Sequence, residues 1–221
     1  MAFRRVVLLL LLAFGLAATF AKTPIAPAQD KDLAEGWSAY SAADYERARA
    51  LYRKAAERSH TLAQFNLAVM LIEGQGGAAD TKEGLLWLRR AADGGLARAQ
   101  YSLGVFYDRG EHVTKSTMEA TSWFAKAAEQ GWRDAQVSLA TQYFLGRGAP
   151  KDFRQAAKWY ERAAEQGDEG ASYIIASMYE HGDGVAQDLQ RAVYWYSQAA
   201  ALGDRAASIK ARELLNQLRP Q

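Results

Sequence analysis

The sequence predicts an all-α protein: a right-handed α-solenoid of about five helix-turn-helix repeats that ends in a capping helix. Two observations predict this fold. Nearly the same phrase recurs every 36 residues, as "ATSWFAKAAEQGWRDA" at 120–135 and "AAKWYERAAEQGDEGA" at 156–171 show. Within each repeat the apolar residues recur at helical spacing, and no repeat has the alternation typical of a strand. Fixed periods of about 20 to 50 residues are typical of arrays in which each repeat stacks on its neighbours.

The repeats align in columns of small and aromatic residues. Alanine lets neighbouring helices approach closely, and tryptophan fills the space between layers, so we expect both in the core. The columns are Ala63, Ala99, Ala135, Ala171 and Ala207; Trp87, Trp123, Trp159 and Trp195; and Gly95, Gly131, Gly167 and Gly203.

The ends of the helices are marked as well. A residue able to cap a helix precedes each second helix: Asp44, Asp80, Ser116, Asp152 and Asp188. Such a side chain accepts a hydrogen bond from a free amide of the first turn. Glu83, Glu119 and Gln155 follow at the spacing of a capping box. The glycines expected to end the first helices through a left-handed turn are Gly74, Gly110, Gly146 and Gly182.

Residues 1–21 have the pattern of a secretory signal peptide. Arg4 and Arg5 precede an apolar run that ends near Ala18, and Thr19 and Ala21 supply the small residues that a signal peptidase requires. The run is shorter than the roughly 20 residues of a comfortable membrane span, and an uncleaved anchor is the alternative. The chain has no cysteine, which excludes lipid attachment at a lipobox. We therefore expect a periplasmic or secreted protein.

The charge of the expected mature chain excludes several partners. Removal of residues 1–21 takes away two arginines and no acid, which leaves 25 basic and 25 acidic side chains. A neutral chain has no net field to hold nucleic acid or an anionic membrane surface. Residues 22–30 are expected to be a linker, and residues 31–219 the repeat domain.

The last helix is expected to close the array. Residues 208–219 follow the pattern of a first helix without its second, and a polar outer face is typical of a terminal cap. The side chains expected to point outward are Lys210, Glu213, Asn216 and Gln217.

The columns carry a resemblance to a known family. The fifth repeat, "ASYIIASMYEHGDGVAQDLQRAVYWYSQAAALGDRA", resembles the Sel-one-like repeat family, a relative of the tetratricopeptide repeat, and the match is strong over about 63–207. The first unit has a shorter loop and looks more like a plain tetratricopeptide unit. In the third, His112 stands where the pattern has its second glycine, so a longer or less tightly turned loop is expected there. The resemblance implies a protein–protein adaptor.

One face of each first helix lies opposite the core stripe, and it is apolar and aromatic rather than charged. The resemblance places this face on the concave surface of the array, where partners bind. The alternative is that tight curvature buries much of it between successive first helices. The residues expected to bind a protein partner are Phe65, Asn66, Val69, Ile72, Tyr101, Val105, Asp108, Arg109, Val137, Thr141, Phe144, Tyr173, Ile174, Ser177, Glu180 and His181.

Signals for catalysis or metal binding are weak. His60, His112 and His181 have no histidine or cysteine partner at ligand spacing, and the glycine-rich loops lack the lysine of a phosphate loop. We expect no metal, no cofactor and no enzymatic activity.

The predicted function is that of an exported adaptor that regulates an envelope process. A scaffold associated with peptidoglycan or polysaccharide is the alternative, followed by a hydrolase of the β-lactamase-like type, whose relatives carry cysteine pairs that are absent here.

Overall fold

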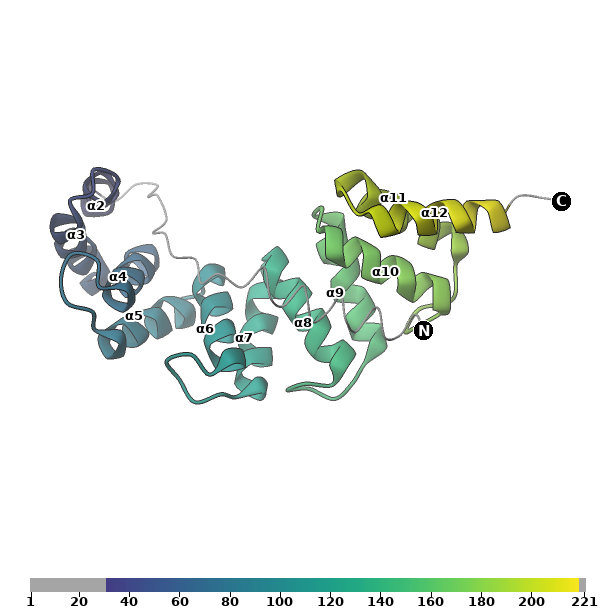
Figure 1. The fold of residues 1–221 in the computed structure, drawn as a ribbon. Helices are drawn as coiled ribbons and strands as arrows, with labels where there is room; N and C mark the ends of the chain where they lie inside the picture. Colours follow the sequence, from purple (N-terminus) through teal and green to yellow (C-terminus); the bar gives the residue numbers. More distant parts are fainter. Residues whose placement is uncertain (1–30, 219–221) are drawn as a thin grey trace. The chain divides into compact units, whose positions relative to one another are not determined.

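The computed structural model describes residues 31–218, and these residues form eleven helices and no strand (Figure 1). In chain order the helices make five two-helix repeats and a single last helix, so the expected α-solenoid is confirmed. The helices are α2 (Lys31–Ser41), α3 (Tyr45–Glu57), α4 (Thr61–Glu73), α5 (Thr81–Asp93), α6 (Ala97–Arg109), α7 (Thr117–Glu129), α8 (Arg133–Leu145), α9 (Phe153–Glu165), α10 (Glu169–His181), α11 (Leu189–Leu202) and α12 (Arg205–Gln217).

The segments expected to be a signal peptide (1–21) and a linker (22–30) lie outside the described residues. Within 31–218, no helix combines the length and the apolar character needed to cross a membrane.

The described chain forms two compact units, and the division falls within the third repeat. The N-terminal unit holds α2 to α6, and the C-terminal unit holds α7 to α12. Within each unit, every helix packs against the next one in the chain. The turns between a second helix and the following first helix have only two or three residues, as at 58–60 and 130–132. Such short turns make sequence neighbours into antiparallel packing partners.

The core of each unit lies where the two helices of a repeat meet those of the next. All four column tryptophans are at most 8% exposed, which confirms their place in the core. Tyr52 and Phe106 are completely or almost completely buried in the N-terminal unit, and so are Tyr160 and Tyr196 in the C-terminal unit. Small residues line the remaining contacts, so the aromatic rings fill the space that the alanines leave.

Four of the five predicted caps are confirmed. The carboxylates of Asp44, Asp80, Asp152 and Asp188 accept hydrogen bonds from backbone amides in the first turns of α3, α5, α9 and α11. Each such bond stabilises its helix by about 1 kcal/mol. The sequence interpretation missed Asp168 and Asp204, which cap α10 and α12 in the same way.

Glu83 has a different role from the capping box expected of it. Its carboxylate accepts hydrogen bonds from both terminal nitrogens of Arg53 on α3, with Nη2 at 2.9 Å from Oε2, and another from Trp87 Nε1 at 3.0 Å. The hydrogen bonds from Arg53 outweigh the effect of burial and lower the pKa of Glu83 from 4.5 to about 2. The pair therefore joins the second helices of the first two repeats.

Replacing Glu83 with glutamine should lower the free energy of unfolding at pH 7 by about 1 to 2 kcal/mol, because Arg53 loses its anionic partner. The contribution of Glu83 is complete above pH 4.5 and is lost as the pH falls toward 2, since the unfolded chain takes up the proton first. Urea unfolding of both proteins at pH 7 and near pH 2 measures this. The two unfolding free energies should converge in acid, and a constant gap would rule out a stabilising ion pair.

The glycine turns are confirmed at the ends of the first helices. Gly74, Gly110, Gly146 and Gly182 have φ between 69° and 77°, in the left-handed region. His112 adopts the same region at φ 62°, as Gly148 does at the equivalent position of the next repeat at φ 71°. The backbone at His112 thus turns as it does in the repeats with glycine, contrary to the expectation of a looser loop.

A ladder of three buried glutamines ties the second, third and fourth repeats to the repeat before each of them. Nε2 of Gln64, Gln100 and Gln136, near the starts of α4, α6 and α8, donates to the carbonyl oxygen eight residues earlier, at 3.3, 3.0 and 3.3 Å. These carbonyls lie in the last turn of the preceding second helix, where intrahelical partners run out. Gln64, Gln100 and Gln136 stand 36 residues apart in the sequence, but the sequence interpretation did not use this column.

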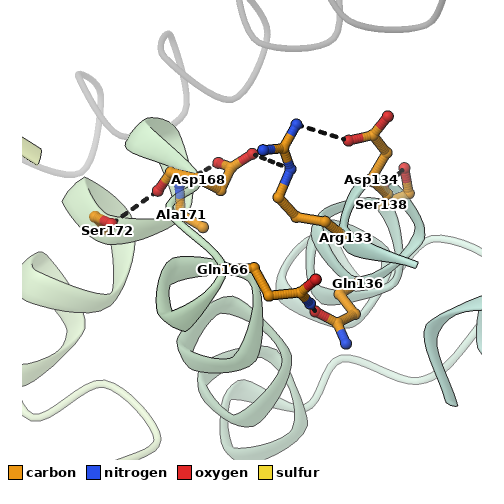
Figure 2. Close-up of polar contacts among 8 residues, drawn as sticks. All are labelled: Arg133, Asp134, Gln136, Ser138, Gln166, Asp168, Ala171 and Ser172. Atoms are coloured by element: carbon orange, nitrogen blue, oxygen red, sulfur yellow. Dashed lines mark hydrogen bonds and ion pairs between the residues drawn. The ribbon is translucent and has the colours of Figure 1, made fainter. Parts of the chain in front are cut away.

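In the C-terminal unit, this ladder extends into a polar network at the starts of α8 and α10 (Figure 2). Gln166 Nε2 donates to Gln136 Oε1 at 2.7 Å. Arg133 lies between two carboxylates, at 3.5 Å from Asp134 and 3.7 Å from Asp168. Asp168 also caps α10 through the amide of Ala171 (2.8 Å). The network holds successive first helices in register.

The last helix is only partly the polar cap that the sequence predicts. Glu213, Asn216 and Gln217 are exposed, as expected. Lys210 is not directed to solvent alone, because its Nζ lies 2.8 Å from Glu180 Oε1 on α10. Ile209 and Leu215 are also exposed, at 58% and 47%.

Candidate protein-binding surface

Most of the predicted binding face is buried. Ten of the sixteen residues are less than 9% exposed, so the expectation of an open stripe is wrong for them: Phe65, Asn66, Val69, Tyr101, Val105, Asp108, Thr141, Phe144, Ile174 and Ser177. Whether any of the sixteen binds a partner stays a prediction.

These residues are buried because a first helix can pack against neighbours on more than one face. α4 packs against α3 on one side and α5 on the other, and all nine residues from 63 to 71 are buried. A helix that is apolar all round is a buried helix, whereas the helical-wheel argument assumed a single core stripe. Thr141 illustrates the outcome in the C-terminal unit, since its Oγ1 lies 2.8 Å from the hydroxyl of the fully buried Tyr160.

Six predicted residues keep access to solvent. Ile72 and Arg109 belong to the N-terminal unit, and Arg109 forms an ion pair with Glu111 at 3.3 Å. The other four belong to the C-terminal unit: Val137, Tyr173, Glu180 and His181. Of these, three are on α10.

The α10 residues meet side chains from the next two helices, and we call this group the α10 cluster: Tyr173, Glu180, His181, Tyr196 and Lys210. Glu180 Oε2 accepts from the Tyr196 hydroxyl at 2.7 Å, and Oε1 accepts from Lys210 Nζ at 2.8 Å. The ring of Tyr173 packs edge-on against that of Tyr196, with centroids 5.2 Å apart. His181 Nδ1 lies 2.8 Å from the carbonyl oxygen of Ser177. The contacts therefore bring together aromatic rings, a carboxylate and an ammonium group, and the imidazole follows the carboxylate directly in the chain.

Glu180, Tyr196 and Lys210 of the cluster keep one charge state each at neutral pH. Burial disfavours the Glu180 anion, but the hydrogen bonds from Lys210 and Tyr196 and the charge of Lys210 outweigh it, so the pKa of Glu180 lies below its usual value. Burial, and then the bond to Glu180, raise the pKa of Tyr196 far above its usual value. The pKa of Lys210 is raised by its hydrogen bond to Glu180. The group is thus a carboxylate, an ammonium and a neutral phenol, which suits orientation of a partner better than proton transfer.

The sequence interpretation missed Tyr196 and Lys210 because both are 16 or more residues from Glu180. It also missed Arg98 at the start of α6, whose guanidinium lies 5.6 Å from the centroid of the Phe65 ring. Burial lowers the pKa of Arg98. Its column holds Leu62, Asp134 and Gly170 in the other repeats, so this departure from the pattern could have revealed it.

The described residues show no sign of a metal centre. Among residues 31–218, no three side chains of histidine, cysteine, aspartate or glutamate come together where they could hold a metal ion.

Comparison with known proteins identifies the repeat. The Sel1 repeat model matches residues 32–60, 61–96, 97–132, 133–168 and 170–204. No curated protein matches the chain. A solved structure of a Sel1 repeat protein from Oxalobacter formigenes is 34% identical with a TM-score of 0.73, over 78% of this chain and 71% of that one. A protein from Escherichia coli, c5321, described as a protective antigen present in uropathogenic strains and displaying an SLR fold, is 36% identical with a TM-score of 0.73 over 78% of this chain. The match covers 37% of the E. coli protein's own length.

Proposed function

This chain belongs to the Sel1 repeat family, and from that membership we propose that it is an adaptor that binds a protein partner through the α10 cluster. Sel1 repeat proteins are generally non-catalytic scaffolds that mediate protein–protein interaction. The membership supports the class of function, and the residues of the cluster support its location.

The observation that carries the proposal is the half-exposed Tyr173 beside an oriented charge pair. Binding hot spots are typically aromatic side chains surrounded by groups that are already held in place. Tyr173 packs on Tyr196, which is in turn bonded to Glu180, so little conformational entropy remains to be lost on binding. His181, next to Glu180 in the chain, is exposed and offers a second contact.

The proposal extends to the place of action. Residues 1–21 have the sequence of a signal peptide, and we propose that the protein works in the periplasm or outside the cell, where it regulates an envelope process by binding one of its components.

Site-specific photo-crosslinking in living cells tests both parts. The full chain is expressed in a Gram-negative bacterium with a photoreactive phenylalanine analogue at Tyr173 or His181, or at the exposed Ser122 on α7 as a control. We expect the protein in the periplasmic fraction, with the mass of a chain that begins at Lys22. We also expect one discrete protein adduct from Tyr173 and His181, and none from Ser122.

Each part can fail separately. Retention in the cytoplasm with residues 1–21 intact would contradict the export proposal alone. Equal adducts from all three positions, or no adduct from Tyr173 and His181, would contradict binding at the α10 cluster.

A further inference from the structure

The outer face of α9 has a shallow depression of about 360 Å³ in the C-terminal unit. Three of its lining residues are basic and lie on one stripe of the helix: Arg154, Lys158 and Arg162. All three are exposed. Ala157 and Val185, the latter from the loop between α10 and α11, provide its apolar part.

Two of these cations are held in place by an aromatic ring. Lys158 Nζ lies 5.3 Å and Arg162 Cζ lies 4.8 Å from the ring centroid of Trp159. Because Trp159 belongs to the core column, it is a rigid support for both. Such cation–π contacts restrict long side chains that would otherwise be mobile.

The depression also contains two carboxylates, but one of them is already neutralised. Glu161 Oε1 accepts from Arg191 Nη2 at 2.7 Å and from the Tyr179 hydroxyl at 3.0 Å. Arg191 is itself held over the ring of Tyr179, at 4.3 Å from its centroid. Glu165, at the end of α9, is the remaining acid against three cations. The depression therefore carries an excess of positive charge.

The other second helices in the described chain do not repeat this pattern. The same three columns hold Glu46, Ala50 and Lys54 on α3; Lys82, Leu86 and Arg90 on α5; Met118, Ser122 and Lys126 on α7; and Gln190, Tyr194 and Gln198 on α11. Three successive cations occur on α9 alone among these five. The stripe is thus a property of this repeat and not of the repeat architecture.

We propose that the outer face of α9 binds an acidic segment of a partner protein whose carboxylates recur at helical i, i+4 spacing. Residues four apart on a helix are separated by about 6 Å along its axis, so a second helix lying along α9 presents carboxylates at the interval of the three cations. Arginine suits this role because its planar fork binds a carboxylate with two hydrogen bonds. Ala157 and Val185 leave an apolar floor for the methylene groups of the glutamates. The inference is independent of the α10 cluster, because it uses another helix and another kind of contact.

Fluorescence anisotropy of the purified protein with a labelled, alanine-based helical peptide tests the proposal. The peptide carries three glutamates at i, i+4 and i+8, and a second peptide of the same composition carries them side by side. We expect the spaced peptide to bind and the contiguous peptide to bind at least about fivefold more weakly, since its charges point in different directions around the helix. The affinity should fall as salt is raised.

Two charge-reversal variants, one on α9 and one on α5, change the net charge of the protein by the same amount. Reversal of Lys158 and Arg162 to glutamate should weaken binding of the spaced peptide by about tenfold or more. Reversal of Lys82 and Arg90 to glutamate should leave it within about twofold, although these residues occupy the columns of Arg154 and Arg162 on α5 and Arg90 also lies over a tryptophan, Trp87. If the reversed α9 variant loses helicity, the neutral pair Arg154→Gln and Lys158→Gln replaces it, with a loss of about threefold expected.

Three results would overturn the proposal. They are the absence of binding by the unmodified protein at low salt, equal binding of the two peptides, and an equal loss from the α5 and α9 variants. The last two would indicate only a general attraction between a charged peptide and the protein surface.

Discussion

Replacing Gly148 with alanine should lower the free energy of unfolding of the C-terminal unit by about 3 kcal/mol or more. The residue has φ 71°, where an L-residue costs about 1 to 2 kcal/mol. A Cβ at this position would also lie 2.1 Å from the carbonyl oxygen of Thr117 and 2.5 Å from Thr121 Oγ1. The first of these atoms is backbone at the start of α7, so the loop and the helix have to separate.

Gly131→Ala is the matched control for this substitution. Gly131 belongs to the same unit and has φ 86°, but no atom lies within 4 Å of the Cβ that alanine would add. The Gly131→Ala variant should therefore lose only about 1 kcal/mol of the free energy of unfolding, which is the cost of the backbone conformation. Urea unfolding followed by circular dichroism measures both. Equal losses would mean that the loop is not packed against α7 as the structure places it.

Replacing Phe65 with alanine should cost about 3 to 5 kcal/mol of the free energy of unfolding, because its ring is completely buried and a cavity remains. The sequence interpretation assigned Phe65 to the binding face, where the same change would reduce affinity and leave stability nearly intact. The two interpretations therefore predict different measurements for one variant.

The exposed Leu86 on α5 is the control for Phe65, since it is apolar, lies in the same unit and is 59% exposed. Leu86→Ala should change stability by no more than about 0.5 kcal/mol. If Phe65→Ala were as stable as Leu86→Ala in thermal and urea unfolding, the assignment of Phe65 to the core would be wrong.

The binding face shows where reasoning from a single helix stops. A wheel drawn for one helix separates Phe65 and Tyr101 from the core stripe, and both are buried. Tyr173 has the same place on its own wheel and remains half-exposed. α4 and α10 each pack against two helices. Which side chains of those neighbours cover a given position is a property of the array, so no local pattern contains it.

Ion pairs between residues far apart in the chain are also hard to predict from local patterns, but the alignment of the repeats makes two of them predictable. Arg53 pairs with Glu83 on the second helices of the first two repeats, and Glu161 pairs with Arg191 at the equivalent columns of the last two, with the charges exchanged. In both pairs the partners are 30 residues apart. Complementary charges in the same two columns were visible in the sequence and could have predicted both contacts once the repeats were aligned.

The sequence by itself determined the period of the array, the aspartates that begin the second helices and the glycines that end the first. These features depend on hydrogen bonds within a few residues, such as the one that the amide of Gln155 donates to Asp152, and local chemistry is enough to fix them. Only the tertiary structure decided which side chains of the first helices reach solvent and which charges meet, as Glu180 and Lys210 do. Exposure and ion pairing depend on the distances between helices that are far apart in the chain, and these distances are set by how whole repeats pack.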